Sequence, residues 1–459
     1  MKMRKVLFIA YHFPPIGGSG VQRPAKFVKY LPQFGWQPYV IAADQDQVQG
    51  TDTTLLADIP SVVPVWRVST PRPQPVKRLA KLVGWQPVPS PVPAETSGVA
   101  PGRAASPGLS LATRLRRAIL SPLTVVENPL IDDKLYWSLR IVPLARRIIR
   151  QENIDAILTT SPPWSPALAG ALLQELTGRP WTCDARDPWT DNSFTYHNTG
   201  LRHGFDRLVE TRVLETASAI VSVTEPVLNM LREKVSQEDR VKPFLTIPNG
   251  FDRNDFVDGY VDVGDMPVRE QQRITLLHPG QAYQGVTQPL LAALEQLRYH
   301  NNLVERLHFH FVGQMHSADV HAIVNSSFSH LFCLDLERVP HPDAIRLMQA
   351  ADMLLLLLRG SPEASSGKVY EYMAAGVPAL AIASGVGADL VRRSGIGCAI
   401  DPDNIVQLAT ILGQIAQDYD SFRRQFYHPD REFISQFDRQ MLTQQLASLL
   451  DHVISTHGT

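Results

Sequence analysis

One stretch limits the fold more than any other: a wholly apolar run, residues 353–358, leads through a short loop into a segment with helical character. Residues 363–378, which follow it, read EASSGKVYEYMAAGVP. Gly376 ends the helical segment, and a second apolar run covers residues 377–382. A strand, a loop, a helix and a strand in this order predict a parallel sheet covered by helices. In such sheets, ligands bind at the carboxyl ends of strands and at helix N-termini.

The polar residues of this stretch are the strongest candidates for a site. Glu363 and Glu371 stand eight positions apart, the spacing E-x7-E, with Lys368 between them. They lie where a sugar and a nucleotide could be bound, and Ser366 and Gly367 are expected at the start of the helix. The alternative is a helix cap and a solvated helix face.

Two other ligand-binding patterns, one for phosphate and one for a metal ion, have little support in this chain. The phosphate-loop pattern G-x-x-x-x-G-K-[ST] fails, because Pro362 replaces its first glycine and Val369 its last residue. Residues 44–46 and 401–403 are literal D-x-D sequences, which a metal-dependent transferase of another fold would use. Both are expected to be polar loops after strands.

The alternation of strand and helix patterns runs through the whole chain and predicts an α/β protein with doubly wound parallel sheets. A length of 459 residues exceeds one ordinary domain, and a hydrophobic content of 44% can fill two cores. We expect an N-terminal domain over residues 1–240 and a C-terminal domain over 241–435. Residues 436–459 are expected to form a terminal helix that packs back on the N-terminal domain.

Each predicted domain begins with a strand that leads into a glycine loop. The apolar run 6–10 precedes Gly17 and Gly18, and the run 274–278 precedes Gly280. Backbone N–H groups and a helix N-terminus at such a loop can face an anion. Alone the signal is weak, because many Gly-Gly-Ser-Gly loops are only tight turns.

A charged cluster, Asp184, Arg186 and Asp187, follows the predicted strand 180–183. Charged side chains at the end of a buried strand are candidates for a catalytic site. The alternative is a structural ion pair of Arg186 with Asp184 or Asp187.

Composition limits the kinds of partner and the cellular compartment that are expected for this chain. A formal net charge of -1 gives no case for a nucleic-acid partner, and three scattered cysteines (Cys183, Cys333 and Cys398) fit a reducing compartment. No metal-type Cys/His spacing is present, and the apolar N-terminal run of about five residues is too short for a signal peptide. The chain is therefore expected in the cytoplasm.

A proline-rich insertion spans residues 70–108, and two basic amphipathic pieces, 76–83 and 109–120, lie in and after it. Such pieces could lie on an anionic membrane surface, so the protein could be peripheral on the inner membrane face. The alternative is a solvated helix face.

Five motifs in this order resemble glycosyltransferase family 4, the group 1 type, in its surface-polysaccharide branch. They are Phe13-Pro14-Pro15 with 17–23, residues 160–163, residues 184–189, residues 248–252 and the Glu363/Glu371 pair with 374–378. The resemblance implies the GT-B fold, two Rossmann-like domains facing a cleft. It also implies a retaining, metal-independent glycosyltransferase of the hexosyltransferase type, without a cofactor.

The resemblance further implies the substrates. The donor is a nucleoside-diphosphate sugar, and the acceptor is a glycan or a lipid-linked molecule in cell-surface polysaccharide or glycolipid synthesis. Retention in this family is usually ascribed to a front-face mechanism in which the leaving phosphate helps to deprotonate the acceptor.

The resemblance assigns roles to individual residues. Glu363 contacts the donor sugar and stabilises an oxocarbenium-like transition state, and Glu371 binds the ribose. The remaining donor contacts come from both domains, with Asp187 and Arg186 as catalytic candidates of the N-terminal one. The donor-binding set is Lys368, Gly367, Ser366, Gly280, Asn249, Gly17 and Gly18.

The chain also departs from the family pattern. Relatives often carry an arginine and a lysine in the loop after the first strand of the second domain, but residues 280–287 contain no cation. Lys368 or Arg359 could substitute, or donor binding could be weak. Two other functions therefore stay open: a non-catalytic scaffold subunit of a polysaccharide assembly complex, and an epimerase of the same fold.

Overall fold

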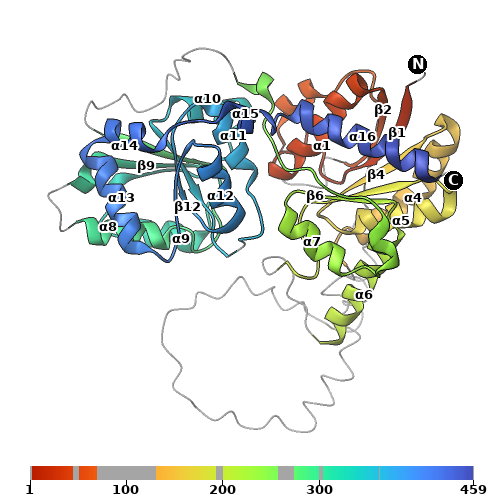
Figure 1. The fold of residues 1–459 in the computed structure, drawn as a ribbon, viewed down its shortest axis with the longest axis horizontal. Coiled ribbons are helices and arrows are strands. Elements are labelled where there is room, and N and C mark those ends of the chain that lie inside the picture. The colour runs from red at the N-terminus through yellow and green to blue at the C-terminus, as the bar shows by residue number, and fades with distance from the viewer. Residues whose placement is uncertain are drawn as a thin grey trace, which may run out of the picture.

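The structure is a computed structural model that describes residues 3–44, 51–69, 131–192, 200–256, 273–298, 303–360 and 362–457. Within these ranges the chain forms two α/β units, each built on one parallel sheet (Figure 1). The predicted α/β class with two doubly wound sheets is confirmed.

The N-terminal sheet has seven strands in the order β3-β2-β1-β4-β5-β6-β7. The strands are β1 Arg4–Ile9, β2 Trp36–Ala43, β3 Val65–Val68, β4 Ala156–Ser161, β5 Trp181–Ala185, β6 Ala219–Ser222 and β7 Phe244–Thr246. The helices of this unit are α1 Ser19–Tyr30, α4 Leu135–Glu152, α5 Ser165–Thr177, α6 Leu201–Thr216 and α7 Glu225–Glu233.

The C-terminal sheet has six strands in the order β10-β9-β8-β11-β12-β13. The strands are β8 Ile274–Pro279, β9 Leu307–Val312, β10 Phe332–Asp335, β11 Met353–Leu357, β12 Ala379–Ile382 and β13 Gly397–Ile400. The helices are α8 Gln288–Leu297, α9 Ser317–Val324, α10 His341–Ala350, α11 Gly367–Ala375, α12 Gly385–Arg393, α13 Ile405–Gln417, α14 Tyr419–Phe426 and α15 Arg431–Ser435. Both sheets share the Rossmann order 3-2-1-4-5-6, so each has its switch point between its first and fourth strands.

The continuous apolar runs form strands that are buried on both faces. In β1, Leu7 belongs to one core cluster and Phe8 to the cluster on the other face of the sheet. In β11, Leu355 and Leu356 divide between two clusters in the same way. A strand with helices on both faces needs apolar residues at every position, which is the pattern that the sequence shows.

The predicted strand–loop–helix–strand unit is present as β11, α11 and β12. Ser366 is the N-cap of α11, and its Oγ atom accepts a hydrogen bond of 3.3 Å from the backbone N–H of Lys368. Gly376 ends the helix in the left-handed region, with φ 76°, where glycine is favoured.

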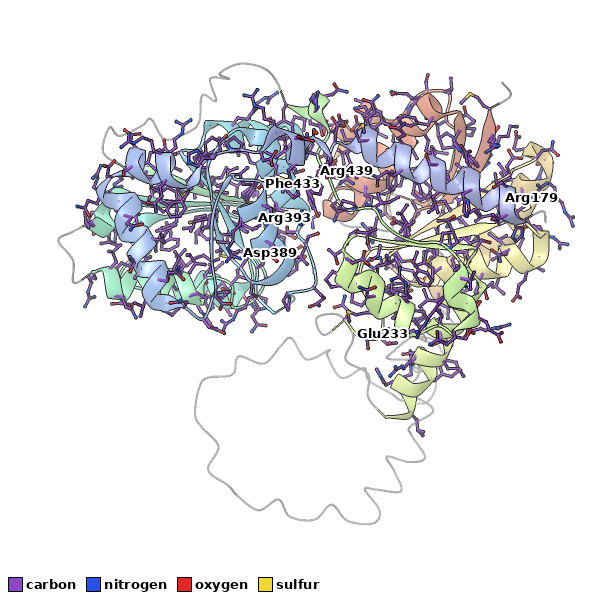
Figure 2. All side chains as sticks on the ribbon, viewed as in Figure 1. Arg179, Glu233, Asp389, Arg393, Phe433 and Arg439 are labelled. Atoms are coloured by element: carbon purple, nitrogen blue, oxygen red, sulfur yellow. The ribbon has the colours of Figure 1, made fainter. Side chains whose placement is uncertain are left out.

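Two chain segments cross between the units and pair with each other. The N–H of Phe251 donates to the carbonyl of Phe437, and the N–H of Arg439 donates to the carbonyl of Phe251. A Cβ atom at Gly250 would lie 2.2 Å from the carbonyl oxygen of Phe437, so this crossing needs glycine. Arg439 begins α16, Arg439–His457, at the junction of the two units (Figure 2).

The terminal helix α16 lies on the N-terminal unit (Figure 1). Leu442, Leu446 and Leu450 share a core cluster with Phe27 of α1. The proline-rich insertion 70–108 and the two basic pieces, 76–83 and 109–120, lie outside the described residues. Among the described helices, none combines the length and the apolar character needed to cross a membrane.

Candidate active site

The carboxyl ends of the two sheets meet at the loop that carries Glu363. Thr224 caps α7 directly after β6, and its hydroxyl donates a hydrogen bond of 2.7 Å to the backbone carbonyl of Glu363. Glu363 is half-buried in this loop. The contact places the Glu363 loop of the C-terminal unit against a strand end of the N-terminal unit, where α/β sheets bind ligands.

Lys368 lies at the switch point of the C-terminal sheet, held by two acceptors. Its Nζ atom is 2.9 Å from Nε2 of His278 and 2.7 Å from the carbonyl oxygen of Gln281. Nδ1 of His278 lies 2.8 Å from the carbonyl oxygen of Leu355, so Nδ1 carries the proton and Nε2 accepts from Lys368. His278 was not predicted as a site residue, because in the sequence it stands at the end of a predicted strand with no motif of its own.

Burial controls the charge of both groups. It lowers the pKa of His278 to about 3, with the Lys368 charge acting in the same direction, so the imidazole is neutral. It also lowers the pKa of Lys368 to about 7, although the Glu371 carboxylate opposes this shift. A negatively charged ligand beside Lys368 would stabilise the charged form of the amine that burial destabilises.

The glycine loop after β8 lacks cations of its own, but two reach it from elsewhere. Arg359 Nη1 lies 3.3 Å from the carbonyl oxygen of Gly285 and 3.1 Å from Oε1 of Gln288. Lys368 contacts the carbonyl of Gln281 in the same loop. Both cations that the sequence offers as substitutes thus contact this loop.

Gly280 opens the loop with φ 81°, a backbone conformation that favours glycine. A Cβ atom at Gly280 would also lie 3.1 Å from Cε of Lys368. A larger residue there would displace the lysine. Further along, Oδ2 of Asp319 accepts a hydrogen bond of 2.7 Å from the N–H of Gly285 and keeps the loop in place.

The N-terminus of α11 begins at a serine cap. Ser366 Oγ accepts from the backbone N–H of Lys368, and a Cβ atom at Gly367 would meet nothing within 4 Å. Helix starts of this kind can face an anion with the N–H groups that have no partner within the helix.

Glu371 is linked to the N-terminal unit through His341, a connection that the sequence does not reveal. Its Oε1 atom lies 2.9 Å from Nε2 of His341, the first residue of α10, and the His341 backbone N–H donates 3.1 Å to Oδ2 of Asp52. These residues are far apart in the chain, and only the tertiary structure brings them together.

Arg186 holds loops of the N-terminal unit together. Its guanidinium donates to three backbone carbonyls, those of Ser161 (3.1 Å), Gly20 (2.9 Å) and Pro162 (2.9 Å). Burial lowers its pKa, while the charges of Asp187 and Asp184 oppose that shift. Arg186 thus joins the start of α1 to the loop after β4.

Asp184 pairs with Arg23, so it does not form the ion pair with Arg186 that the sequence analysis gave as one form of its alternative. Arg23 Nη2 and Nε lie 2.8 Å from Oδ1 and 3.0 Å from Oδ2 of Asp184, and both side chains are 1% exposed. Thr160 adds a hydrogen bond of 2.8 Å to the same carboxylate. A buried arginine selects this partner because a carboxylate fits two of its N–H groups at once.

Asp187 lies toward the opposite unit. Burial raises its pKa, with Arg186 opposing the shift and Asp184 adding to it. Burial and then the charge of Asp187 raise the pKa of Tyr283, which belongs to the glycine loop of the C-terminal unit.

His12 lies near Arg186 and was not predicted as a site residue. Burial, followed by the positive charge of Arg186, lowers the pKa of His12 to about 4. Its position in the sequence, shortly after the first predicted strand, could have marked it as a candidate, because ligands bind at such strand ends.

The remaining predicted residues lie at the same junction. A Cβ atom at Gly17 would be 3.3 Å from Cβ of Asp52, and Gly18 precedes α1 with φ 115°. Asn249 is half-buried in the segment that crosses between the units. Its neighbour Pro248 accepts a hydrogen bond of 2.8 Å from Arg23 through the backbone carbonyl.

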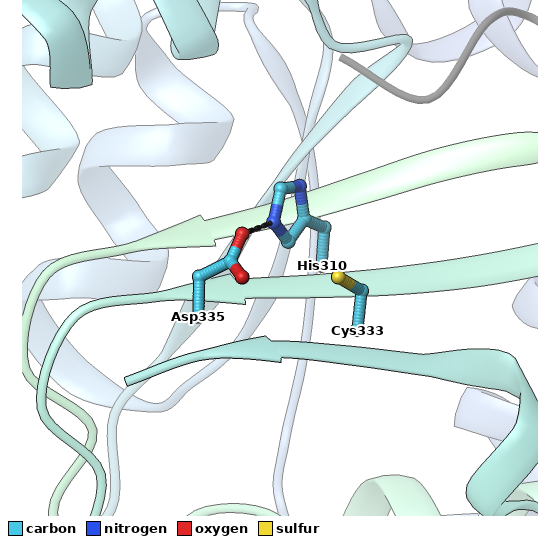
Figure 3. A group of neighbouring side chains, drawn as sticks. All are labelled: His310, Cys333 and Asp335. Atoms are coloured by element: carbon cyan, nitrogen blue, oxygen red, sulfur yellow. Dashed lines mark hydrogen bonds and ion pairs between the residues drawn. The ribbon is translucent and has the colours of Figure 1, made fainter. Parts of the chain in front are cut away.

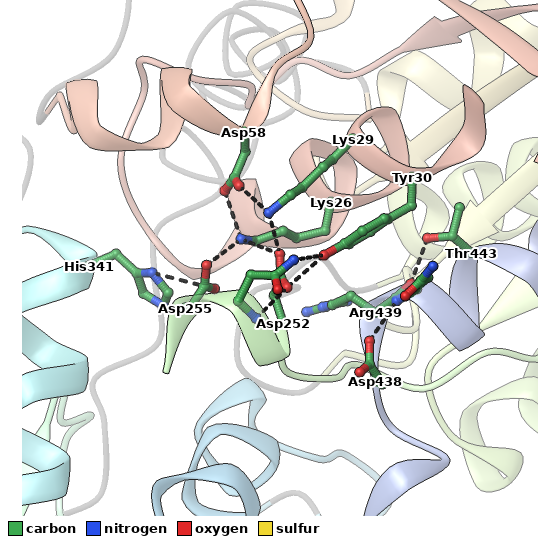
Figure 4. A network of polar contacts seen from close by, with 12 residues as sticks. Lys26, Lys29, Tyr30, Asp58, Asp252, Asp255, His341, Asp438, Arg439 and Thr443 are labelled. Carbon is green, nitrogen blue, oxygen red and sulfur yellow. Dashed lines mark hydrogen bonds and ion pairs between the residues drawn. The ribbon is translucent and has the colours of Figure 1, made fainter. Parts of the chain in front are cut away.

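Two groups of side chains in the described part of the chain have metal-ligand character. Lysines already occupy the first group, Asp58, Asp252 and Asp255 (Figure 4). Lys26 Nζ lies 2.7, 2.8 and 2.6 Å from these three carboxylates, respectively, and Lys29 contacts two of them. This group is an ion-pair network between α1 and the crossing segment.

The second group is His310, Cys333 and Asp335, on one face of β9 and β10 (Figure 3). His310 Nε2 lies 2.6 Å from Oδ2 of Asp335 and is engaged in that pair. Nδ1 of His310 is buried without a partner, although metal-bound histidines usually donate from this second nitrogen. The group therefore has the character of a structural hydrogen bond between His310 and Asp335 rather than of a metal site.

Comparison with known families identifies the chain. Residues 101–255 match the sequence model of Glycosyltransferase Family 4, and residues 273–418 match that of Glycosyl transferases group 1. The chain belongs to this glycosyltransferase family. The match favours a transferase over the epimerase alternative. No curated protein matches the chain by sequence at a significant level.

Solved structures support the GT-B fold. Anabaena HepE, crystallised with UDP and glucose, has a TM-score of 0.60 at 16% identity, covering 98% of this chain and 100% of that one. Sucrose-phosphate synthase from Thermosynechococcus elongatus has a TM-score of 0.62 at 14% identity, covering 98% and 99%. WaaG, a glycosyltransferase involved in lipopolysaccharide biosynthesis, has a TM-score of 0.56 at 14% identity, covering 97% and 99%. Likeness at these identities shows the fold alone.

Proposed function

We propose that this glycosyltransferase moves a sugar from a nucleoside-diphosphate sugar to an acceptor, with retention of configuration and without a metal ion. The observation that carries the proposal is the arrangement at the end of β11. There the N-terminus of α11, the Lys368 ammonium and the carboxylates of Glu363 and Glu371 lie on one short segment. HepE, the structural neighbour crystallised with UDP and glucose, supports a nucleotide-sugar ligand.

In this proposal the leaving diphosphate lies against the N-terminus of α11. The first N–H groups of the helix, Lys368 and Arg359 offset the charge that grows on the diphosphate as the glycosidic C–O bond breaks. Fixed donors of this kind can replace the metal ion that other transferases use for the same purpose. Ser366, Gly367 and Gly280 keep this phosphate position open.

Glu363 lies beside the donor sugar and stabilises the positive charge on the anomeric carbon. Glu371 binds the ribose of the nucleotide. The acceptor oxygen bonds to the anomeric carbon on the face that the diphosphate leaves. The acceptor proton passes to a leaving phosphate oxygen, so the reaction needs no covalent enzyme intermediate.

The N-terminal unit contributes the acceptor side. Gly17 and Gly18 allow the backbone after β1 to approach the substrates closely. Asp187, whose pKa is raised by burial, lies toward the donor loop and orients the acceptor, while Arg186 keeps the surrounding loops in place. Asn249 belongs to the segment that crosses between the units, and in this proposal it contacts the donor.

A membrane-proximal acceptor suits one surface of the described chain. On α6, Leu201 is 97% exposed, and Phe205 and Leu208 follow it along the same face. The carboxylates of Asp206 and Glu210 point inward and pair with Arg202 and Lys234. The exposed part of α6 thus carries three large apolar side chains beside the exposed side chains of Arg207 and Arg212, a combination typical of surfaces that bind anionic lipids.

We therefore place the enzyme in the cytoplasm at the inner membrane face, acting in cell-surface polysaccharide or glycolipid synthesis. WaaG, which shares the fold, acts in lipopolysaccharide biosynthesis, and this supports the assignment by analogy.

A thermal-shift screen over UDP-, GDP-, ADP- and TDP-sugars tests the proposal, because a ligand that binds only the folded state raises its stability. One donor should raise the melting temperature, and the protein should then hydrolyse it slowly or transfer its sugar. A donor that binds without any turnover, with membrane extract as a source of acceptor, would favour the scaffold alternative.

A further inference from the structure

His341 is the first residue of α10 and has partners in three parts of the molecule. Its Nε2 atom lies 2.9 Å from Oε1 of Glu371, and its Nδ1 atom lies 3.9 Å from Oδ2 of Asp255. Its backbone N–H donates 3.1 Å to Oδ2 of Asp52 in the N-terminal unit. Only 14% of the side chain is exposed, so these contacts fix the ring.

We propose that His341 is a positioning residue that holds one oxygen of Glu371 so that the rest of the carboxylate faces the ribose hydroxyls of the donor nucleotide. The inference rests on the proposed function, because it takes Glu371 as the ribose ligand. It adds a second residue to nucleotide recognition, from a different helix and with a link to the other unit.

Glu371 would be conformationally free without a partner. A glutamate on a helix has three rotatable side-chain bonds, and ordering such a side chain costs conformational entropy. The contact with His341 orders Glu371 before the nucleotide arrives, so binding does not bear that cost. A carboxylate has about four acceptor directions, and the bond to His341 leaves the others available.

The charges around His341 decide its protonation. Burial acts to lower its pKa, but the carboxylates of Glu371 and Asp255 outweigh burial and the Lys26 ammonium, and the net shift is upward. Asp52 faces its backbone N–H, and Lys26 lies behind Asp255 in the ion-pair network (Figure 4). The protonated ring donates a charge-assisted hydrogen bond to Glu371, and its charge also faces Asp255 across 3.9 Å, whereas the neutral ring makes only an uncharged hydrogen bond.

The same contacts connect Glu371 to the glycine loop after β1. Asp52 accepts from His341, and its own N–H donates 2.7 Å to the carbonyl of Pro15, just before Gly17. The position of the N-terminal loop and the orientation of the ribose ligand are therefore linked through three hydrogen bonds, by way of the ring and the backbone N–H of His341.

The test measures ribose discrimination, the ratio of the Kd for a 2′,3′-dideoxynucleoside diphosphate to the Kd for its ribose counterpart. UDP, GDP and ADP serve as ribose probes, each with its dideoxy form. The proteins are the wild type, His341→Ala, His341→Gln, Asp52→Ala and Glu371→Ala. His330→Gln is the matched control, because it removes a histidine 3.1 Å from Glu305 on the exposed surface.

In the wild type, the ribose form should bind at least roughly tenfold better, as expected for one hydrogen bond to a charged group. His341→Ala should lose most of this ratio while its Kd for the dideoxy form stays within about twofold. His341→Gln, which retains an N–H donor, should keep part of the ratio, and Asp52→Ala should lie between wild type and His341→Ala. In the wild type the ratio should fall as pH rises through the raised pKa of His341.

Other outcomes would overturn the inference. If Glu371→Ala loses the ratio but a folded His341→Ala keeps it, Glu371 binds ribose without help from His341, and the proposed function stands. If wild type binds no probe, or if Glu371→Ala keeps the ratio, the ribose role of Glu371 fails as well. Thermal melting of each variant shows whether it is folded, and His341→Gln replaces His341→Ala if the latter is not.

Discussion

The ammonium of Lys368 lies 2.9 Å from Nε2 of His278, a buried imidazole that can only accept there because its other nitrogen donates to the Leu355 carbonyl. The pair places a cation at the switch point of the C-terminal sheet, and no carboxylate among the described residues is in hydrogen-bond contact with it. A carboxylate partner would neutralise the lysine, whereas a neutral imidazole leaves its charge available to a diphosphate.

Replacing Lys368 by methionine should weaken binding of the cognate nucleoside diphosphate by roughly 100-fold, as expected for loss of a charge-assisted hydrogen bond. The same change should raise the melting temperature at pH 6, because the folded protein no longer has to bury an ammonium. Calorimetry and thermal melting measure the two effects. Lys242→Met is the control: Lys242 is also partly buried and bonds the Leu214 carbonyl at 3.1 Å, away from the site. Unchanged nucleotide affinity would remove Lys368 from the donor site.

The affinity of the wild type for the diphosphate should depend on pH. The pKa of Lys368 is lowered to about 7, so the amine is charged below pH 7 and increasingly neutral above it. Binding of the anion then requires proton uptake, and affinity should fall by up to about tenfold per pH unit above pH 7. Calorimetry in buffers of different ionisation enthalpy measures the uptake. The same pH dependence in Lys368→Met would assign it to another group.

Lys368 also shapes the pH dependence of stability. Its folded pKa lies below the ordinary value of 10.5, so the unfolded chain binds more protons between these two values. The free energy of unfolding should therefore rise with pH from about 7 upward, relative to that of Lys368→Met. Denaturant titrations of both proteins at pH 7 and pH 9 measure the difference. An equal change in both would contradict the assigned pKa.

Replacing Glu363 by glutamine should lower the rate of sugar transfer by roughly 100-fold or more while the donor Kd changes little. The amide keeps the shape of the side chain but no longer stabilises positive charge on the anomeric carbon. Steady-state transfer and nucleotide-sugar titration separate the two quantities. Glu233→Gln on the exposed end of α7 is the control. A variant with normal turnover would show that Glu363 does not act at the reacting carbon.

Replacing Asp184 by alanine should destabilise the protein by about 3–5 kcal/mol, because it leaves the Arg23 guanidinium buried and unpaired. The double variant Arg23→Met/Asp184→Ala should recover much of that loss. Denaturant unfolding of the single and double variants measures the coupling, and Asp389→Ala on the exposed face of α12 should change stability by less than about 0.5 kcal/mol. Additive effects would mean that the pair contributes no specific coupling.

Vesicle binding tests the membrane proposal on the full chain. The wild type should sediment with anionic vesicles and release as salt rises, and Leu201→Gln/Leu208→Gln should bind several-fold less. Val406→Gln, which changes a residue 68% exposed on α13, should bind like wild type. Equal binding to neutral vesicles, or unchanged binding of the double variant, would contradict a role for α6.

Much of the architecture was predictable. The apolar runs at β1 and β11 carry the strand signal because helices cover both faces of each sheet and every position must be apolar. Ser366 and Gly376 mark the two ends of α11 through their own backbone and side-chain chemistry. Local rules of this kind need no information from distant residues, and they also place Lys368 and Glu363 at a helix start.

The partners of the site residues were not predictable in the same way. The sequence offered Arg186 as the partner of Asp184, because the two stand close in the chain. Arg23 takes that place instead, since the guanidinium of this α1 residue reaches the buried carboxylate near the end of β5. Proximity in the chain says little about contacts between parallel strands and the helices that cross them.

The sequence by itself therefore determined two Rossmann-like sheets, their glycine loops and the carboxylate pair of α11, because these depend on periodicity, caps and turns. The tertiary structure alone decided that His278 holds Lys368, that His341 holds Glu371 and that Thr224 meets the Glu363 loop. Those contacts join residues that are distant in the sequence, and only the packing of helices on the sheets and of one unit against the other sets the distances on which hydrogen bonds and shifted pKa values depend.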